Sequence, residues 1–207
     1  MAKQPISVPF VPYDYLRKVS EEFLIRHHPS GAIPVPVEEI IEFQFGLDIV
    51  PTPGMHEEFD IDAFITNDLT TIYVDDFVYK SRPGRYRFSL AHELAHLILH
   101  ADIFKQLHFS TIEEWKETIG NIPEKEYGSL EWQAYALAGL ILVPTNALVE
   151  HFQKAVARLP AAGLSLKSAA ESDVARHIIE SALARDFLVS AEVIERRANY
   201  DGLWRLT

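Results

Sequence analysis

The chain has 207 residues, of which 48% are hydrophobic and 24% charged, and its formal net charge is −11 at pH 7. This composition is typical of a globular protein, and the absence of cysteine excludes disulfides, thiol nucleophiles and cysteine-ligated zinc sites. The negative charge argues against direct nucleic-acid binding, because phosphate contacts require a basic surface. No apolar run reaches the ~20 residues of a membrane span and no signal-peptide pattern is visible, so we expect a cytoplasmic location without a membrane partner.

The first part of the chain predicts two helices and then a small sheet. After an extended, proline-containing arm of about a dozen residues, Asp14 is the expected N-cap of a first helix. Pro36 opens a second helix, which Gly46 terminates. Three strands are predicted next, at Leu47–Val50, Phe59–Thr66 and Thr70–Val74. Asn67-Asp68 joins the last two as a hairpin, so we expect a mostly antiparallel sheet.

The remainder is predicted to be mainly helical. The basic segment Lys80–Arg87, which contains Pro83-Gly84, is interpreted as a loop that leads into a helix around His92–His96. An irregular stretch is expected after His100, and Ser129 is the expected N-cap of the next helix. Apolar periodicity then predicts four helices, at Leu130–Leu142, Thr145–Leu159, Ala169–Phe187 and Ala191–Asn199.

Two histidines and a glutamate have the spacing of a zinc-hydrolase helix, in the segment His92-Glu93-Leu94-Ala95-His96. Residues i and i+4 share one helix face, so His92 and His96 can bind one ion. Glu93 lies beside them, where it can hold and deprotonate a metal-bound water. The flanking residues are apolar, which favours a cleft over an exposed helix face. The alternative is a pair of ordinary surface histidines.

A catalytic zinc needs a third protein ligand and leaves one position for water. The extended metzincin pattern is absent, because Leu99 and Asp102 stand where it requires Gly and His. His100 lies about 12 Å along the helix from His92, which favours an outer or capping role. Glu131 is the best candidate, because a carboxylate on an otherwise apolar helix is costly to bury without a partner. It could instead only serve the helix N-terminus. Competing acids in less apolar surroundings are Glu113, Glu114, Glu117, Glu124 and Glu126.

Most of the chain resembles the ImmA/IrrE family of zinc metallopeptidases. The matching segments are Ile33–Ile40, Asp60–Phe64 with Thr71–Val74, Arg87–His100, and Glu131 to Pro144. The resemblance implies that His92, His96 and Glu131 bind the metal and that Glu93 is catalytic. Zn²⁺ is the implied ion, although imidazole and carboxylate ligands would also accept Mn²⁺, cobalt or iron. The chain departs from the family pattern where Ala95, Gln133 and Tyr135 replace the usual Gly, Glu and Asn.

The resemblance also implies an α+β fold in two parts. Residues 1–144 would form a zincin-like metallopeptidase domain with a small sheet, and residues 145–207 an all-helical, helix-turn-helix-like lobe. Residues 145–207 contain eight basic and eight acidic side chains, so we expect this lobe to pack or dock to a partner rather than bind DNA.

The implied activity is that of a zinc-dependent endopeptidase. Its expected substrate is a helix-turn-helix transcriptional repressor, whose cleavage would control a stress response or a mobile element. The alternative is a metal-binding regulatory module that docks to a repressor without cleaving it.

Overall fold

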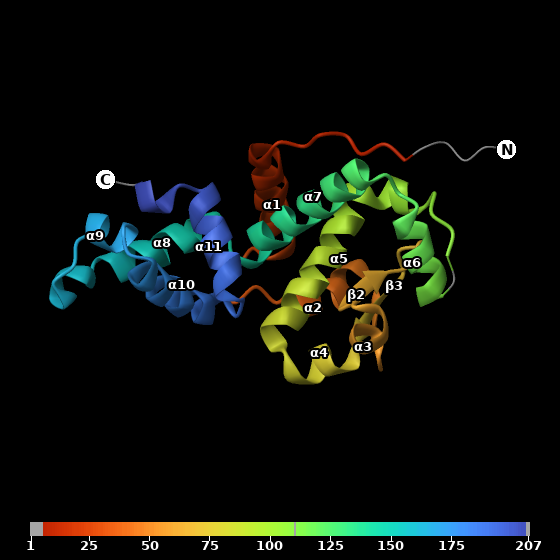
Figure 1. Ribbon diagram of the computed structural model, residues 1–207, viewed down its shortest axis with the longest axis horizontal. Coiled ribbons are helices and arrows are strands. Elements are labelled where there is room, and N and C mark those ends of the chain that lie inside the picture. The colour runs from red at the N-terminus through yellow and green to blue at the C-terminus, as the bar shows by residue number, and fades with distance from the viewer. Residues whose placement is uncertain (1–5, 110, 206–207) are drawn as a thin grey trace.

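The computed structural model describes residues 6–109 and 111–205, so residues 1–5 of the predicted arm and residues 206–207 of the predicted lobe lie outside it. Helices and a single small sheet make up this part of the chain (Figure 1), which confirms the α+β class. Residues 6–12 have no regular secondary structure, as expected for an extended arm.

The two predicted N-terminal helices form. Helix α1 (Tyr13–His27) has Pro12 rather than Asp14 at its N-cap position, so it begins slightly earlier than predicted. Helix α2 (Val37–Glu39) continues directly into a wider turn of the π type, Ile40–Phe45. Gly46 ends this helical segment as predicted, with a left-handed φ of 69° that glycine adopts without strain.

The sheet consists of β1 (Asp48–Thr52), β2 (Ala63–Ile65) and β3 (Thr71–Asp75), in the order β1-β3-β2. The predicted hairpin is confirmed, since β2 and β3 pair antiparallel. The expectation of a mostly antiparallel sheet is wrong, because β1 pairs parallel with β3 and the sheet is mixed. Parallel neighbours require a crossover connection, and helix α3 (Met55–Phe59), which the sequence did not indicate, lies in that connection.

The basic segment Lys80–Arg87 is helical, not a loop. Helix α4 (Asp76–Ser81) is capped by the Asp75 side chain, which accepts hydrogen bonds from two backbone amides. Helix α5 (Pro83–Phe104) starts directly afterwards. Pro83 does not prevent the helix, because at the first position of a helix proline lacks only an amide hydrogen that has no partner there. Helix α5 also continues past His100, where an irregular stretch was expected.

Helix α6 (Ile112–Gly120) precedes helix α7 (Glu124–Leu142), which begins earlier than predicted. Ser129 is therefore not an N-cap, and its hydroxyl donates to the carbonyl of Lys125 within the helix. This correction bears on Glu131, which lies beyond the first turn of α7. The attraction of acids to a helix N-terminus falls off within that first turn, so it does not explain Glu131.

From Thr145 to Arg205 every regular element is helical. These elements are α8 (Thr145–Val156), a 3₁₀ turn (Leu159–Ala162), α9 (Leu166–Ala170), α10 (Asp173–Phe187), α11 (Ala191–Tyr200) and a second 3₁₀ turn (Leu203–Arg205). The single helix predicted at Ala169–Phe187 is divided, because the Ser172 side chain caps a new start for α10. A proposed boundary at residue 144 falls between α7 and α8, although one cluster of buried hydrophobic side chains extends across it.

Helix α7 connects the two ends of the molecule. Figure 1 shows α8 to α11 gathered at one end and the sheet at the other, with α7 between them. Helix α11 folds back onto α7, where the buried Arg197 donates a 2.9 Å hydrogen bond to the carbonyl of Gly139. Within residues 6–109 and 111–205, no single helix is long and apolar enough to cross a membrane. Only the segments Glu124–Leu142 and Thr145–Ala162 meet that criterion together, and they are bent by 63°.

Candidate metal centre

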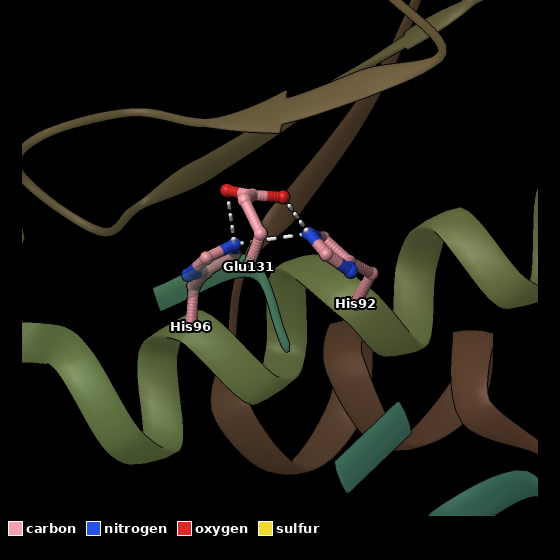
Figure 2. A group of neighbouring side chains, drawn as sticks. All are labelled: His92, His96 and Glu131. Atoms are coloured by element: carbon pink, nitrogen blue, oxygen red, sulfur yellow. Dashed lines mark hydrogen bonds and ion pairs between the residues drawn. The ribbon is translucent and has the colours of Figure 1, made fainter. Parts of the chain in front are cut away.

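Three side chains from two helices converge on one point (Figure 2). The Nε2 atoms of His92 and His96 on α5 lie 3.0 Å apart. Glu131 on α7 directs both carboxylate oxygens at them, with Oε2 3.1 Å from Nε2 of His92 and Oε1 3.6 Å from Nε2 of His96. Among the residues that the structure describes, this is the only group of three or more histidines and acids whose ligand atoms all lie within 4.8 Å of one another.

The packing of α5 against α7 produces this convergence. These two helices make the most extensive contact between any two elements described. Ala91 and Ala95 on α5, like Ala134 and Ala138 on α7, are completely buried. Side chains this small let helix backbones approach closely, which brings the Glu131 carboxylate within reach of the histidine pair.

The donor atoms fit a divalent metal. Two imidazole nitrogens and one carboxylate oxygen are a common protein ligand set of catalytic zinc. In a tetrahedral site with bonds of about 2.1 Å, ligand atoms lie about 3.4 Å apart. The three separations between donor atoms, 3.0, 3.1 and 3.6 Å, fall around that value.

The pKa values of the two histidines shift in opposite directions. Burial, and then the neighbouring His92 and His100, lower the pKa of His96 well below its usual value, so its ring is neutral at pH 7. Burial also disfavours the charged form of His92, but the hydrogen bond to Glu131 and the charges of Glu93 and Glu131 outweigh it and raise the His92 pKa. The Glu131 carboxylate therefore favours the protonated form of His92, as it would favour a cation at the same place.

Glu93 lies beside this group and is held by the sheet. Its side chain is only 6% exposed, and its Oε2 accepts a 2.9 Å hydrogen bond from the backbone amide of Ile65 on β2. Burial raises the pKa of Glu93 to about 8; His92 and the Ile65 amide lower it by smaller amounts, and the charge of Glu131 raises it further. A carboxyl group with a pKa near neutrality can both accept and return a proton.

The remaining sequence candidates lie outside the three-residue group. His100 is an outer partner, as the spacing suggested, with its Nδ1 3.1 Å from Nδ1 of His96. Glu126 binds the backbone amide of Val8 instead. None of the other competing acids joins the group among the described residues; these are Glu113, Glu114, Glu117 and Glu124.

The group lines a cleft of about 720 Å³ between the sheet and helix α11. One wall includes Ala63 of β2, and the other includes Val193 and Arg196 of α11. Tyr127 and Tyr135 of α7 also line it, and Arg196 stacks over the Tyr135 ring at 4.6 Å. Only Tyr135 among these lining residues was noted from the sequence, as a departure from the family pattern; the others carry no motif and meet only through the fold.

A smaller pocket of about 290 Å³ adjoins the cleft between α1, α7 and α11. The two spaces share Glu131, Tyr135, Val193 and Arg196. Tyr13 and Tyr200, whose rings stack at 4.6 Å, line the smaller pocket.

Comparison with known proteins identifies one family. The family model for peptidase M78, described as the IrrE N-terminal-like domain, matches residues 71–199. No curated protein shows significant similarity to the chain. Among solved structures, a Mycobacterium tuberculosis transcriptional regulator is similar, with a TM-score of 0.54 and 15% identity over 88% of this chain and 45% of the regulator. The chain thus spans less than half the length of that regulator, and the likeness is one of fold alone.

Proposed function

This chain belongs to the peptidase M78 family of IrrE N-terminal-like domains, and on that premise we propose that it is a metal-dependent endopeptidase. His92, His96 and Glu131 hold the ion, and Glu93 is the catalytic base. The observation that carries the proposal is the convergence of three ligand atoms within 4.8 Å beside a buried carboxyl group. We propose Zn²⁺ as the ion, although Mn²⁺ or another divalent metal would fit the same ligands.

The protein's own groups move the proton. When bound, the ion supplies Lewis-acid polarisation of the scissile carbonyl. Glu93 accepts a proton from the attacking water and then delivers it to the leaving amine. The Ile65 amide holds one oxygen of Glu93, so the other oxygen is left for this proton.

Strand β2 offers a place for an extended peptide. It lies at the edge of the sheet. Asp62 and Thr66 form backbone hydrogen bonds with β3, through the Asp62 carbonyl at 2.8 Å and the Thr66 amide at 2.9 Å. Because these bonds alternate along a strand, the backbone groups of Ala63 point to the opposite edge, and Ala63 lines the cleft. We propose that the substrate adds to β2 along this edge.

The proposed substrate is a helix-turn-helix repressor, cleaved in the cytoplasm to control a stress response or a mobile element. The family membership supports this choice. Helix α11 of the proposed lobe forms a wall of the cleft, so residues 145–207 would contribute to substrate selection. Their equal numbers of acidic and basic side chains support a role in protein contact without direct nucleic-acid binding.

The test incubates the protein with a purified helix-turn-helix repressor as the candidate substrate. Zinc-loaded wild-type protein is expected to release fragments detectable by intact mass spectrometry. Glu93→Gln should retain zinc and slow cleavage by a factor of about 100 to 10,000, because the amide cannot accept the proton. Glu124→Gln, at an exposed position on the same helix as Glu131, is the matched control and should cleave normally. A tight complex of the wild-type protein without fragments would instead support a docking module.

A further inference from the structure

A chain of hydrogen bonds runs from His96 to the N-terminal arm. Nδ1 of His96 lies 3.1 Å from Nδ1 of His100, and Nε2 of His100 lies 3.1 Å from Oε1 of Gln133. The Gln133 side-chain amide then donates a 2.8 Å hydrogen bond to the backbone carbonyl of Pro9. His96, His100 and Gln133 are each no more than 3% exposed, so bulk water does not replace these contacts.

The carbonyl at the end fixes the direction of every bond. A carbonyl can only accept, so the NH₂ group of Gln133 faces Pro9 and its oxygen faces His100. Nε2 of His100 must then carry the hydrogen, which leaves Nδ1 of the neutral ring as an acceptor. Nδ1 of His96 donates to that acceptor. The lone pair of His96 is therefore on Nε2, the atom that faces His92 and Glu131.

The arm is held in place by a second contact. The backbone amide of Val8 donates a 2.6 Å hydrogen bond to Glu126, which lies on α7 as Gln133 does. The Val8 side chain is itself buried. The segment Val8-Pro9 therefore contacts α7 at two places, through the Val8 amide at Glu126 and through the Pro9 carbonyl at Gln133.

We propose that the Pro9 carbonyl, Gln133 and His100 set the tautomer of His96, so that the N-terminal arm prepares a metal-ligand atom before any ion binds. His100 and Gln133 are positioning residues in this arrangement, since neither belongs to the three-residue group. The inference rests on the proposed function only in treating His96 as a ligand. The tautomer itself is a property of the metal-free chain.

The first test is NMR of the metal-free, ¹⁵N-labelled full-length protein. Long-range ¹H–¹⁵N correlations of the imidazoles report which nitrogen of each histidine carries hydrogen. We expect hydrogen on Nδ1 of His96 and on Nε2 of His100. In His100→Phe, which removes the acceptor, the His96 ring should change to the other tautomer or to an average of both. A wild-type His96 with hydrogen on Nε2, or a signal unchanged in His100→Phe, would overturn the proposal.

The second test measures Zn²⁺ affinity by competition with a chelator. Loss of an outer hydrogen-bond partner weakens metal binding by roughly 10- to 100-fold, and we expect this for His100→Phe. Gln133→Met should also bind more weakly, and it keeps the proposal testable if His100→Phe does not fold. Gln133→Glu is the discriminating control. Its carboxylate still accepts from His100, so zinc affinity should remain near that of the wild type although the bond to Pro9 is lost.

The two proposals fail in different ways. Equal zinc affinity of the wild type, His100→Phe and Gln133→Met would overturn the tautomer relay and leave the proposed metal site intact. Absence of zinc binding by the wild type would overturn the proposed function. In that case the NMR measurement on the metal-free protein still decides the relay by itself.

Discussion

The carboxylate of Glu93 accepts its 2.9 Å hydrogen bond from the backbone amide of Ile65, so the edge strand β2 orients a side chain of helix α5. The two residues are 28 positions apart in the sequence. Strand β2 thus has two roles in the proposed mechanism, since it holds the base with one amide and offers the neighbouring Ala63 backbone to a peptide.

Shortening Glu93 tests whether this orientation matters. Glu93→Asp keeps a carboxylate, but its side chain is one methylene too short to place that carboxylate at the same position. A displacement of about 1 Å can lower turnover roughly 100-fold. We expect that loss in kcat, with zinc content unchanged. Glu93→Gln provides the comparison, because it retains the length and loses the base. A kcat of the Glu93→Asp variant close to that of the wild type would show that the Ile65 contact has no role in positioning the carboxylate.

Removing the third ligand should remove the metal. Glu131→Ala is expected to weaken Zn²⁺ binding by more than the roughly 100-fold that loss of an outer partner causes, and to abolish peptide hydrolysis. Chelation of the wild-type protein should give the same loss of activity, reversible by added zinc. The control is Glu124→Ala, because Glu124 is exposed on the same helix. Stoichiometric, tight zinc in the Glu131→Ala variant would exclude Glu131 as a ligand.

Tyr127 is the residue that we expect to stabilise the developing oxyanion. It lines the cleft, and burial followed by the charges of Glu131 and Glu93 raises the pKa of Tyr127 to about 12. Its hydroxyl is therefore protonated at pH 7 and can donate. Tyr127→Phe should lower kcat by roughly 100-fold, the usual effect of losing one oxyanion donor, with KM and zinc content little changed. Tyr15→Phe, at an exposed position of α1, should have no effect on kcat.

The stability of the protein should depend on pH through Glu180. This buried side chain accepts a 3.1 Å hydrogen bond from Trp204, and burial raises its pKa above the usual 4.5 despite that bond and the nearby Arg176. The folded state therefore retains a proton that the unfolded state has lost. Stability should fall as the pH rises from 4.5 through the raised pKa.

Glu180→Gln removes this dependence because the amide is neutral and still accepts from Trp204. Urea unfolding between pH 4 and pH 8 should show the variant gaining in stability relative to the wild type as the pH rises. The exposed Glu171→Gln serves as the control. A wild-type protein whose stability increases relative to that of Glu180→Gln with rising pH would contradict the assignment.

Local patterns in the sequence were sufficient to bring His92 and His96 together. The i, i+4 spacing places His92 and His96 on one helix face whatever surrounds the helix. An acid on an otherwise apolar helix made Glu131 a candidate beside other acids, and in the structure its side chain is 35% exposed and directed at both histidines. Apolar periodicity predicted most of the helices, with errors at their ends. Pro83 and Ser129 were misinterpreted because the same residue types start, interrupt or occupy helices according to their neighbours.

Only the tertiary structure decided what surrounds those three side chains. The parallel pairing of β1 with β3 depends on a crossover, and strand patterns do not encode which strands become neighbours. The Gln133–Pro9 and Arg197–Gly139 contacts join residues 124 and 58 positions apart. Such contacts depend on how whole helices and the arm pack. A buried polar group forms a hydrogen bond with the partner that the fold places beside it. The sequence by itself therefore determined which side chains form the candidate metal site, and the packing decided which groups orient them.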